Sequence, residues 1–99
     1  MPVFSFPDEA RWSATENAVE FAVELGEYRG VVRVRRAVFQ VLLDQPATPQ
    51  NCLATFHLER SRFERAAEDK IRRRELSGDG NVELTGRDLR PSRRKQDRG

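Results

Sequence analysis

Residues 48–76 read TPQNCLATFHLERSRFERAAEDKIRRREL, and this stretch marks both ends of a long helix. Thr48 can cap the first backbone amides, and Pro49 suits the first helical position because no hydrogen bond is lost there. No glycine or proline follows until Gly78, and the last turns carry three arginines, where the helix dipole favours cations. The stretch therefore predicts a single helix of about seven turns from Pro49 to about Leu76.

The apolar side chains of this helix share one face. A projection at about 100° per residue places these residues on one stripe: Leu53, Phe56, Phe63, Ala67 and Ile71, with Cys52 at its edge. Such spacing is typical of a helix that packs on a hydrophobic core, and we expect the opposite, charged face to be solvated.

Arg60 interrupts the apolar stripe. A guanidinium in such a position needs a carboxylate or access to water. One interpretation is structural: the stem packs on aromatic rings while the head reaches water or a carboxylate such as Glu20, Glu24 or Asp88. The other interpretation is functional and makes Arg60 an anion-binding residue at the mouth of a groove.

Two strands joined by a turn are expected before the helix. Residues 18–25 alternate between apolar and polar side chains, residues 26–30 are turn-like, and residues 31–35 resume the alternation. This pattern predicts an antiparallel hairpin with one polar face. The preceding polar segment holds Trp12, which we expect to cover the rim of the core. The pairs expected across the polar face are formed by Glu20 and Glu24 with Arg33 and Arg35.

Shorter elements complete the predicted fold. Residues 3–6 predict a short edge strand, and residues 82–84 predict a last strand. Thr85 and Asp88 have the spacing of a capping turn, which leaves Leu89 free to cover the core. The expected fold is α+β, with a small antiparallel sheet of three to four strands covered by one short and one long helix.

The short helix is predicted at residues 37–43 and ends before Pro46. It is apolar nearly all round, as are helices that are sandwiched in a core or exposed at a subunit contact. We therefore consider a homodimer that forms through Phe39 and Leu43, together with Leu58, which also falls outside the main stripe.

The length and composition indicate one domain, which we place at residues 1–89 of the 99-residue chain. No apolar run approaches about 20 residues, and the first residues lack the basic and apolar segments of a signal peptide. A single cysteine cannot form an internal disulfide, which is typical of a reducing compartment. We therefore expect a cytoplasmic protein without a membrane span.

The net charge of +2 is unevenly distributed along the chain. Residues 90–99 carry five basic residues and one acidic residue, a net +4, which leaves −2 on residues 1–89. This basic tail has no aliphatic side chain and is expected to be disordered. A solvated end is the simpler interpretation. The alternative is a weak, salt-sensitive contact with a polyanion, for which the candidate residues are Arg90, Arg93, Arg94, Lys95 and Arg98.

The order of four segments is distinctive. They are the strand at residues 18–25, the strand and short helix at residues 31–43, the helical run with Phe56, Arg60, Phe63 and Ala67, and the closing VELTGRDL at residues 82–89. Over about residues 3–89, this order resembles a bacterial family of domains of unknown function, number 1488. The resemblance implies a small α+β fold from a bacterial cytosol, with no established activity.

Common catalytic and metal-binding motifs are absent from the sequence: there is no Gly-rich phosphate loop, cysteine pair, His-x-x-x-His spacing or serine elbow. Cys52 and His57 are the only candidates for a nucleophile and its base, but their spacing on one helix points them in different directions. Cys52 fits a small core residue better, and His57 fits a boundary residue. We therefore expect no catalytic residue, no cofactor and no metal site.

Two hypotheses for the function follow. The first is a non-enzymatic domain that acts through protein–protein contacts, as a homodimer or as an accessory factor. The alternative is a nonspecific nucleic-acid-associated protein that uses the basic tail. The apolar Phe39 and Leu43 favour the first hypothesis and the tail favours the second, whereas a groove around Arg60 would favour an enzyme.

Overall fold

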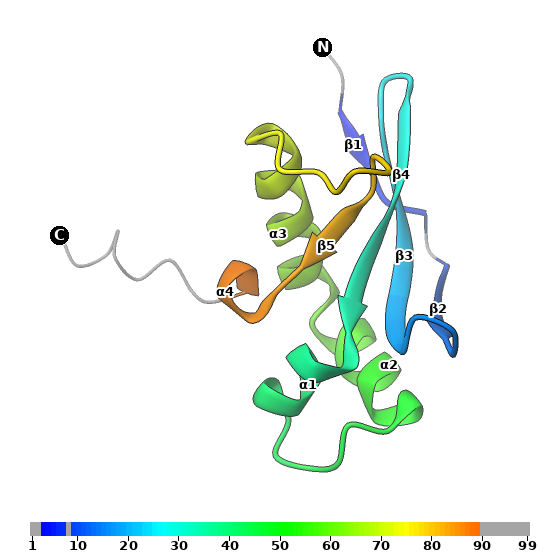
Figure 1. The fold of residues 1–99 in the computed structure, drawn as a ribbon, viewed down its shortest axis with the longest axis vertical. Coiled ribbons are helices and arrows are strands. Elements are labelled where there is room, and N and C mark those ends of the chain that lie inside the picture. The colour runs from blue at the N-terminus through cyan, green and yellow to red at the C-terminus, as the bar shows by residue number, and fades with distance from the viewer. Residues whose placement is uncertain (1–2, 8, 90–99) are drawn as a thin grey trace, which may run out of the picture.

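The predicted hairpin forms the centre of a five-stranded sheet (Figure 1). The computed structural model describes residues 3–7 and 9–89. The elements in chain order are β1 (Phe4–Ser5), β2 (Ala10–Ser13), β3 (Ala18–Leu25), β4 (Tyr28–Arg35), α1 (Arg36–Leu42), α2 (Pro49–Leu58), α3 (Arg60–Arg72), β5 (Val82–Leu84) and α4 (Gly86–Leu89). The fold is therefore α+β, as the sequence predicts, and the helices gather on one side of the sheet (Figure 1).

Strands β3 and β4 pair along their full length, and Leu25 lies opposite Tyr28 at the turn. The turn therefore contains only two residues. Gly26, the first of them, has a φ of 61°, in the left-handed region that glycine adopts without a steric penalty. The second strand begins earlier than predicted because this tight turn lets the pairing continue to the end of β3.

The cross-strand pairs of the hairpin are only partly those predicted. Glu20 lies opposite Arg33, as expected from the alternation. Glu24 instead lies opposite Arg29, and Arg35 lies opposite Ala18. The earlier start of β4 supplies Arg29 as the neighbour of Glu24, which leaves Arg35 to find a partner outside the hairpin.

Strands β1 and β2 lie one after the other on the same edge of β3, both antiparallel to it. β1 confirms the short edge strand expected at residues 3–6. β2 corrects the prediction for residues 10–13, which the sequence assigns only to a polar segment. Trp12 of β2 packs against the core, while Arg11 bonds with Glu20 on the other face of the sheet. Four residues of alternation are too few to identify a strand from sequence alone.

Strand β5 lies parallel to β4, so the sheet is mixed rather than wholly antiparallel as predicted. A parallel neighbour needs a long crossover connection. The helices α1, α2 and α3 lie between the two strands in the chain and provide that connection.

The predicted capping turn after β5 is confirmed. Asp88 accepts hydrogen bonds from the backbone amide and the hydroxyl of Thr85 at 2.8 and 2.9 Å. This turn begins the short helix α4, which ends at Leu89. Leu89 is buried in the core, as the spacing of the motif predicts.

The long helix predicted from Pro49 is in fact two helices, α2 and α3, which are separated at Glu59. Thr48 caps α2 as predicted, because its hydroxyl accepts a hydrogen bond from the amide of Asn51 at 3.1 Å. Glu59 has φ −115° and ψ 32°, outside the helical region. α2 packs on β2 and β3, whereas α3 packs on β5 and α4. Because a sheet twists, a break at Glu59 lets both helices follow it.

The core lies between the sheet and the helices and is centred on aromatic rings. Phe56 and Phe63 are fully buried, and their ring centroids are 5.4 Å apart. Cys52 is fully buried as well, whereas Leu53 and Ile71 are only partly buried. The buried face is therefore rotated toward Cys52 relative to the predicted stripe.

Phe39 corrects the prediction of a dimer contact. Its side chain is fully buried, with its ring centroid 5.7 Å from that of Phe63. The residue is already enclosed by its own chain, so it cannot contribute an exposed surface. Leu43 is partly buried against the core, whereas Leu58 is 83% exposed.

Candidate functional site

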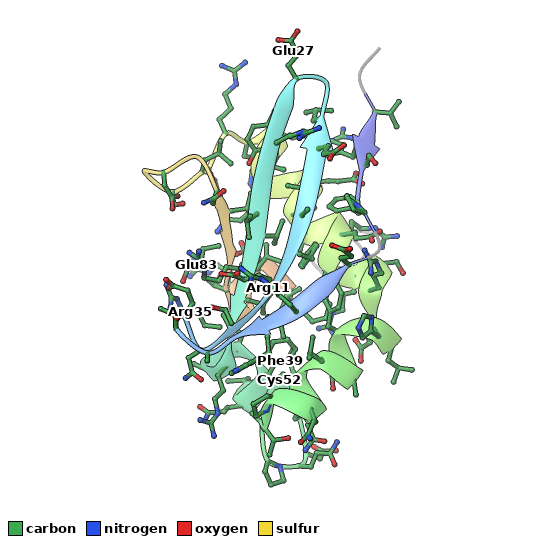
Figure 2. The ribbon with its side chains drawn as sticks, turned by 90° about the vertical axis from the view of Figure 1, so that its right-hand side faces the viewer. Arg11, Glu27, Arg35, Phe39, Cys52 and Glu83 are labelled. Atoms are coloured by element: carbon green, nitrogen blue, oxygen red, sulfur yellow. The ribbon has the colours of Figure 1, made fainter. Side chains whose placement is uncertain are left out.

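The sheet has one face that packs against the helices and one face that the described helices leave uncovered (Figure 2). Alternation along β3 sends Val19, Phe21 and Val23 into the core and therefore directs Glu20 and Ala22 to the opposite face. We call this opposite face the open face. From the other strands it carries Arg11 on β2, Val31, Arg33 and Arg35 on β4, and Glu83 on β5.

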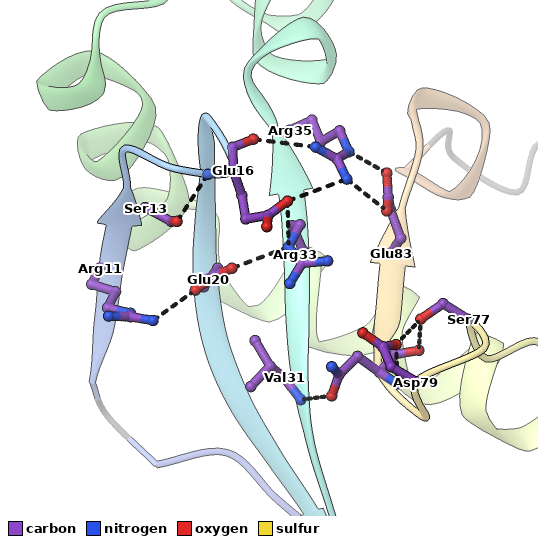
Figure 3. Close-up of polar contacts among 11 residues, drawn as sticks. Arg11, Ser13, Glu16, Glu20, Val31, Arg33, Arg35, Ser77, Asp79 and Glu83 are labelled. Atoms are coloured by element: carbon purple, nitrogen blue, oxygen red, sulfur yellow. Dashed lines mark hydrogen bonds and ion pairs between the residues drawn. The ribbon is translucent and has the colours of Figure 1, made fainter.

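Four charged residues of alternating sign form a row across the open face. Arg11, Glu20, Arg33 and Glu83 are direct neighbours on β2, β3, β4 and β5. Glu20 is only 7% exposed, and both of its carboxylate oxygens are used. Its Oε1 accepts from Nη2 of Arg11 at 2.9 Å, and its Oε2 accepts from Nε of Arg33 at 3.0 Å (Figure 3). We call these four residues the charge row.

Arg35 extends this network beside the charge row (Figure 3). Its Nε donates to Oε2 of Glu83 at 2.6 Å, and its Nη1 donates to the backbone oxygen of Glu16 at 3.2 Å. The hydrogen bond with Glu83 raises the pKa of Arg35 above its ordinary value. Nη2 of Arg35 also lies 3.6 Å from the carboxylate of Glu16. The network thus joins three arginines with three glutamates, and its formal charge is zero.

Two adjoining hollows of about 410 and 460 Å³ lie on the open face and share Arg11, Glu20 and Val31 in their lining. We call them together the sheet groove. The first hollow is mainly apolar, and its lining also includes Pro7, Ala10 and Ala22. The second is mainly polar, and its lining also includes Trp12, Glu16, Arg33 and Asn81.

Arg33 offers unused hydrogen-bond donors in the polar hollow. Its side chain is 17% exposed, and Nε is occupied by Glu20. Its Nη1 and Nη2 make no hydrogen bond with any residue of 3–7 or 9–89. Asn81 lines the same hollow and uses Oδ1 to accept from the amide of Val31 at 3.0 Å. Its Nδ2 likewise donates to none of the described residues.

The contacts of Arg60 agree with the structural interpretation, but its carboxylate partner is Glu64 and not one of the three that were expected. Its Nε donates to Glu64 at 2.6 Å, and its Nη2 donates to the backbone oxygen of Pro7 at 2.6 Å. Its guanidinium also lies over the ring of Phe56, 5.3 Å from the centroid. Arg60 therefore ties the connection between β1 and β2 to α3, and it does not meet Glu20, Glu24 or Asp88 as suggested by the sequence.

The two residues considered for catalysis lie away from the sheet groove. Cys52 is fully buried, and burial raises the pKa of its thiol, an effect that nearby Arg36 opposes only in part. A thiol with a raised pKa is a poor nucleophile. His57 is exposed, and its ring lies at 70° to that of Phe56, with the two centroids 5.4 Å apart. Neither residue lines the sheet groove.

The other site predictions concern a metal ion, a membrane span and the basic residues of the tail. In the described part of the chain, no three His, Cys, Asp or Glu side chains gather in a way that would hold a metal ion. Within the same residues, no helix has the length and apolarity needed to cross a membrane. The predicted polyanion contacts lie outside the described residues: Arg90, Arg93, Arg94, Lys95 and Arg98.

Most of the sheet groove is not anticipated by the sequence. The alternation of residues 18–25 does predict Glu20 on a polar face with Arg33. Arg11 and Glu83 join that face only because β2 and β5 pair with the hairpin. The available signal was the alternation of apolar and polar residues within each of these short strands, which predicts a face for a side chain but not its neighbours.

Comparisons with known proteins agree on one family and one fold. A family model described as "Protein of unknown function (DUF1488)" matches residues 4–84. A crystal structure at 1.60 Å of a protein of unknown function from the DUF1488 family of Shewanella loihica PV-4 has a TM-score of 0.75 and 17% identity, covering 82% of this chain and 90% of that chain. At this identity, the likeness shows a shared fold. No curated protein matches the chain.

Proposed function

The chain belongs to the DUF1488 family of proteins of unknown function, and we propose that it is a non-enzymatic binding module whose sheet groove receives a protein partner. One observation carries the proposal. One face of the sheet is packed by helices, and the other presents a hollowed surface on which Glu20 is held between Arg11 and Arg33. Fixed side chains lose little conformational freedom on binding, which favours recognition.

The chemistry of the groove supports binding rather than catalysis. A general acid or base must exchange a proton with its substrate. Among the residues that line the groove, Glu20 has both oxygens in hydrogen bonds with arginines. The carboxylate of Glu16 lies 3.6 Å from Arg35 and 4.0 Å from Arg33. Arginines stay protonated at physiological pH. A cytosolic setting fits the buried free thiol of Cys52.

A photocrosslinking residue in place of Ala22, which lines the apolar hollow, tests this proposal in the native host. We expect adducts with a protein partner from this position, because a partner in the sheet groove would lie within reach. Arg65, an exposed residue of α3, is the matched control position and should give no adduct or different ones. The adducts are read on gels and by mass spectrometry. An absence of adducts at position 22, or one pattern shared by both positions, would contradict the proposal.

The same experiment separates an accessory factor from a homodimer. With Phe39 enclosed in the core, two of the three residues predicted for a subunit contact remain: Leu58, which is 83% exposed, and the partly buried Leu43. Val41 of α1 is also 81% exposed. Because none of the residues predicted for a subunit contact lines the sheet groove, we favour a different protein as the partner of the groove. An adduct with the mass of two copies, together with a dimer mass in sedimentation at micromolar protein, would instead support the homodimer.

A second candidate function rests on the charge of residues 90–99, which is a net +4 from sequence alone. Their basic side chains would contact phosphates without reading bases. If all five engage single-stranded RNA, the slope of log K against log salt should approach about −3.5, at about −0.7 for each contact. Binding by residues 1–99 that disappears in residues 1–89 would support this function. Equal binding by both, or no binding by either, would contradict it.

A further inference from the structure

The unused nitrogens of Arg33 define the chemistry that the sheet groove can recognise. A guanidinium offers five N–H donors in a rigid fork. Glu20 occupies the Nε side of Arg33 through a hydrogen bond of 3.0 Å, and the carboxylate of Glu16 lies 4.0 Å from the same nitrogen. The opposite end, with Nη1 and Nη2, stays available in the polar hollow, where none of the described residues accepts from it. Two parallel N–H groups match the two oxygens of one carboxylate.

The fork is held in place before any partner arrives. Glu20 is 7% exposed and is fixed from its other side by Arg11, so the Nε bond holds Arg33 at a defined position on the sheet (Figure 3). Side chains that are locked by neighbours lose less entropy on binding than free surface arginines do. Asn81 adds a donor to the same hollow, because its Oδ1 is used by Val31 and its Nδ2 is left over.

The charge balance points to a single carboxylate rather than to a polyanion. Arg11, Arg33 and Arg35 are matched by three glutamates within the network, so the open face has no strong positive field. A strand of nucleic acid binds mainly through such a field. One well-placed bidentate contact does not need it, because its strength comes from geometry and from charge-assisted hydrogen bonds.

The shape of the groove indicates an extended segment rather than a chain end. The polar hollow adjoins the apolar hollow, because both are lined by Arg11, Glu20 and Val31. A peptide whose acidic side chain reaches Arg33 can therefore continue toward Ala22 and Pro7, where an apolar side chain would lose its contact with water.

We propose that the Nη1–Nη2 fork of Arg33 binds an Asp or Glu side chain of an extended segment in the protein partner, with an apolar side chain two residues away lying over Ala22. This inference rests on the proposed function of the sheet groove. It names the recognised group as a carboxylate and its principal ligand as Arg33.

The test is a titration of the ¹⁵N-labelled full chain with a capped seven-residue peptide that contains one Asp and a Leu two residues away, so that both side chains face the sheet when the peptide is extended. We expect saturable shifts of the Nε–H signal of Arg33 and of the amides of Val31 and Asn81, with a Kd in the millimolar range or below. The matched peptide with Asn in place of Asp should bind at least about tenfold more weakly, because it loses the charge-assisted fork.

A substitution at Arg33 separates the effect of its paired N–H donors from the effect of its positive charge. Arg33→Lys keeps a cation beside Glu20 but removes the two parallel donors, and it should weaken binding of the Asp peptide about tenfold. Arg29→Lys, on the same face of the same strand and mostly exposed, is the matched control and should leave the affinity unchanged. The Nε–H signal in the wild-type chain keeps the test valid if Arg33→Lys fails to fold.

Three outcomes would overturn the inference: no saturable shift up to about 10 mM peptide, equal binding of the Asp and Asn peptides, or an unchanged affinity in Arg33→Lys. Tighter binding of inorganic phosphate than of the Asp peptide would also overturn it, by assigning the fork to phosphate groups. Adducts at position 22 without carboxylate binding would retain the proposed function and remove only this inference. Carboxylate binding by Arg33 without adducts at position 22 would retain the recognition of a carboxylate and contradict the proposed function of the groove as a site for a protein partner.

Discussion

Phe56→Ala is expected to lower the free energy of unfolding by about 3–5 kcal/mol, the largest effect of any single change considered for this fold. Phe56 is fully buried, and its ring centroid lies 4.7 Å from that of Phe21 and 5.4 Å from that of Phe63. Its removal leaves a cavity between α2 and the sheet, at the point where strand and helix aromatics meet. A small domain has only about 5–15 kcal/mol of stability in total.

The measurement is thermal unfolding followed by circular dichroism. At roughly 4–8 °C per kcal/mol for a domain of this size, Tm should fall by more than about 12 °C. Leu58→Ala on the same helix is the matched control, because Leu58 is 83% exposed and its truncation should change stability by less than about 0.5 kcal/mol. Equal melting temperatures for the two variants would show that the buried face of α2 is wrongly assigned.

Lys70→Met is expected to cost about 2–3 kcal/mol, somewhat less than breaking a fully buried ion pair. Nζ of Lys70 donates to Oδ2 of Asp88 and to the backbone oxygen of Glu83, both at 2.9 Å. The Lys70 and Asp88 side chains are only 14% and 9% exposed. Without Lys70, the Asp88 carboxylate and the Glu83 carbonyl lose this donor where little water can replace it.

The same pair predicts a dependence on pH. Burial, the largest influence on Asp88, raises the pKa of its carboxyl, but hydrogen bonds from Lys70 and Thr85 outweigh burial and hold that pKa below its ordinary value. A lowered carboxyl pKa stabilises the fold fully above the unfolded-state value of about 3.9, and the contribution is lost as the pH falls through the lower folded-state value. The stability difference between wild type and Lys70→Met should therefore narrow below about pH 4.

Urea unfolding across a pH series measures this difference. Arg29→Met is the matched control, because Arg29 and Glu24 form an exposed pair at 3.8 Å whose loss should cost less than about 1 kcal/mol. The double variant Lys70→Met with Asp88→Asn should recover part of the loss, since no uncompensated carboxylate then remains. A difference from wild type that stays constant down to the most acidic pH would rule out the charge of Asp88 as its cause.

Sequence reasoning is most successful where the pattern is local and long. The eight residues of β3 alternate without interruption, and the strand is found where it was predicted. The caps formed by Thr48 and Thr85 are also confirmed, because each depends on residues within one turn of chain. Local patterns of this kind carry the α+β class and most of the helices.

The failures concern information that is not local. The direction of β5 relative to β4 depends on the path of three intervening helices, which no feature of residues 82–84 records. The break at Glu59 separates a helix that packs on β2 and β3 from one that packs on β5 and α4, although the residues around it all tolerate a helix. The sequence leaves open whether the apolar helix with Phe39 is buried or exposed at a subunit contact, and only the packed fold separates the two.

The residues of the candidate site also divide into those that a local pattern predicts and those that only the whole fold brings together. Glu20 and Arg33 follow from alternation within the hairpin and were predicted as neighbours. Arg11 and Glu83 complete the charge row from strands that reach the hairpin from the two ends of the chain. The unused fork of Arg33 is a property of hydrogen-bond geometry, so it appears only when all the neighbours of the guanidinium are in place.

The position of β5 also has a consequence for the order in which the chain folds. The β3–β4 hairpin is made from adjacent residues, whereas Tyr28 meets Gly80 across 52 residues, and their hydrogen bond requires the whole helical crossover to be in place. Contacts between distant residues form slowly because a long loop must close first. A ribosome must therefore release residues 82–89 before the sheet can be completed, and until then the edge of β4 has unpaired backbone groups that invite aggregation.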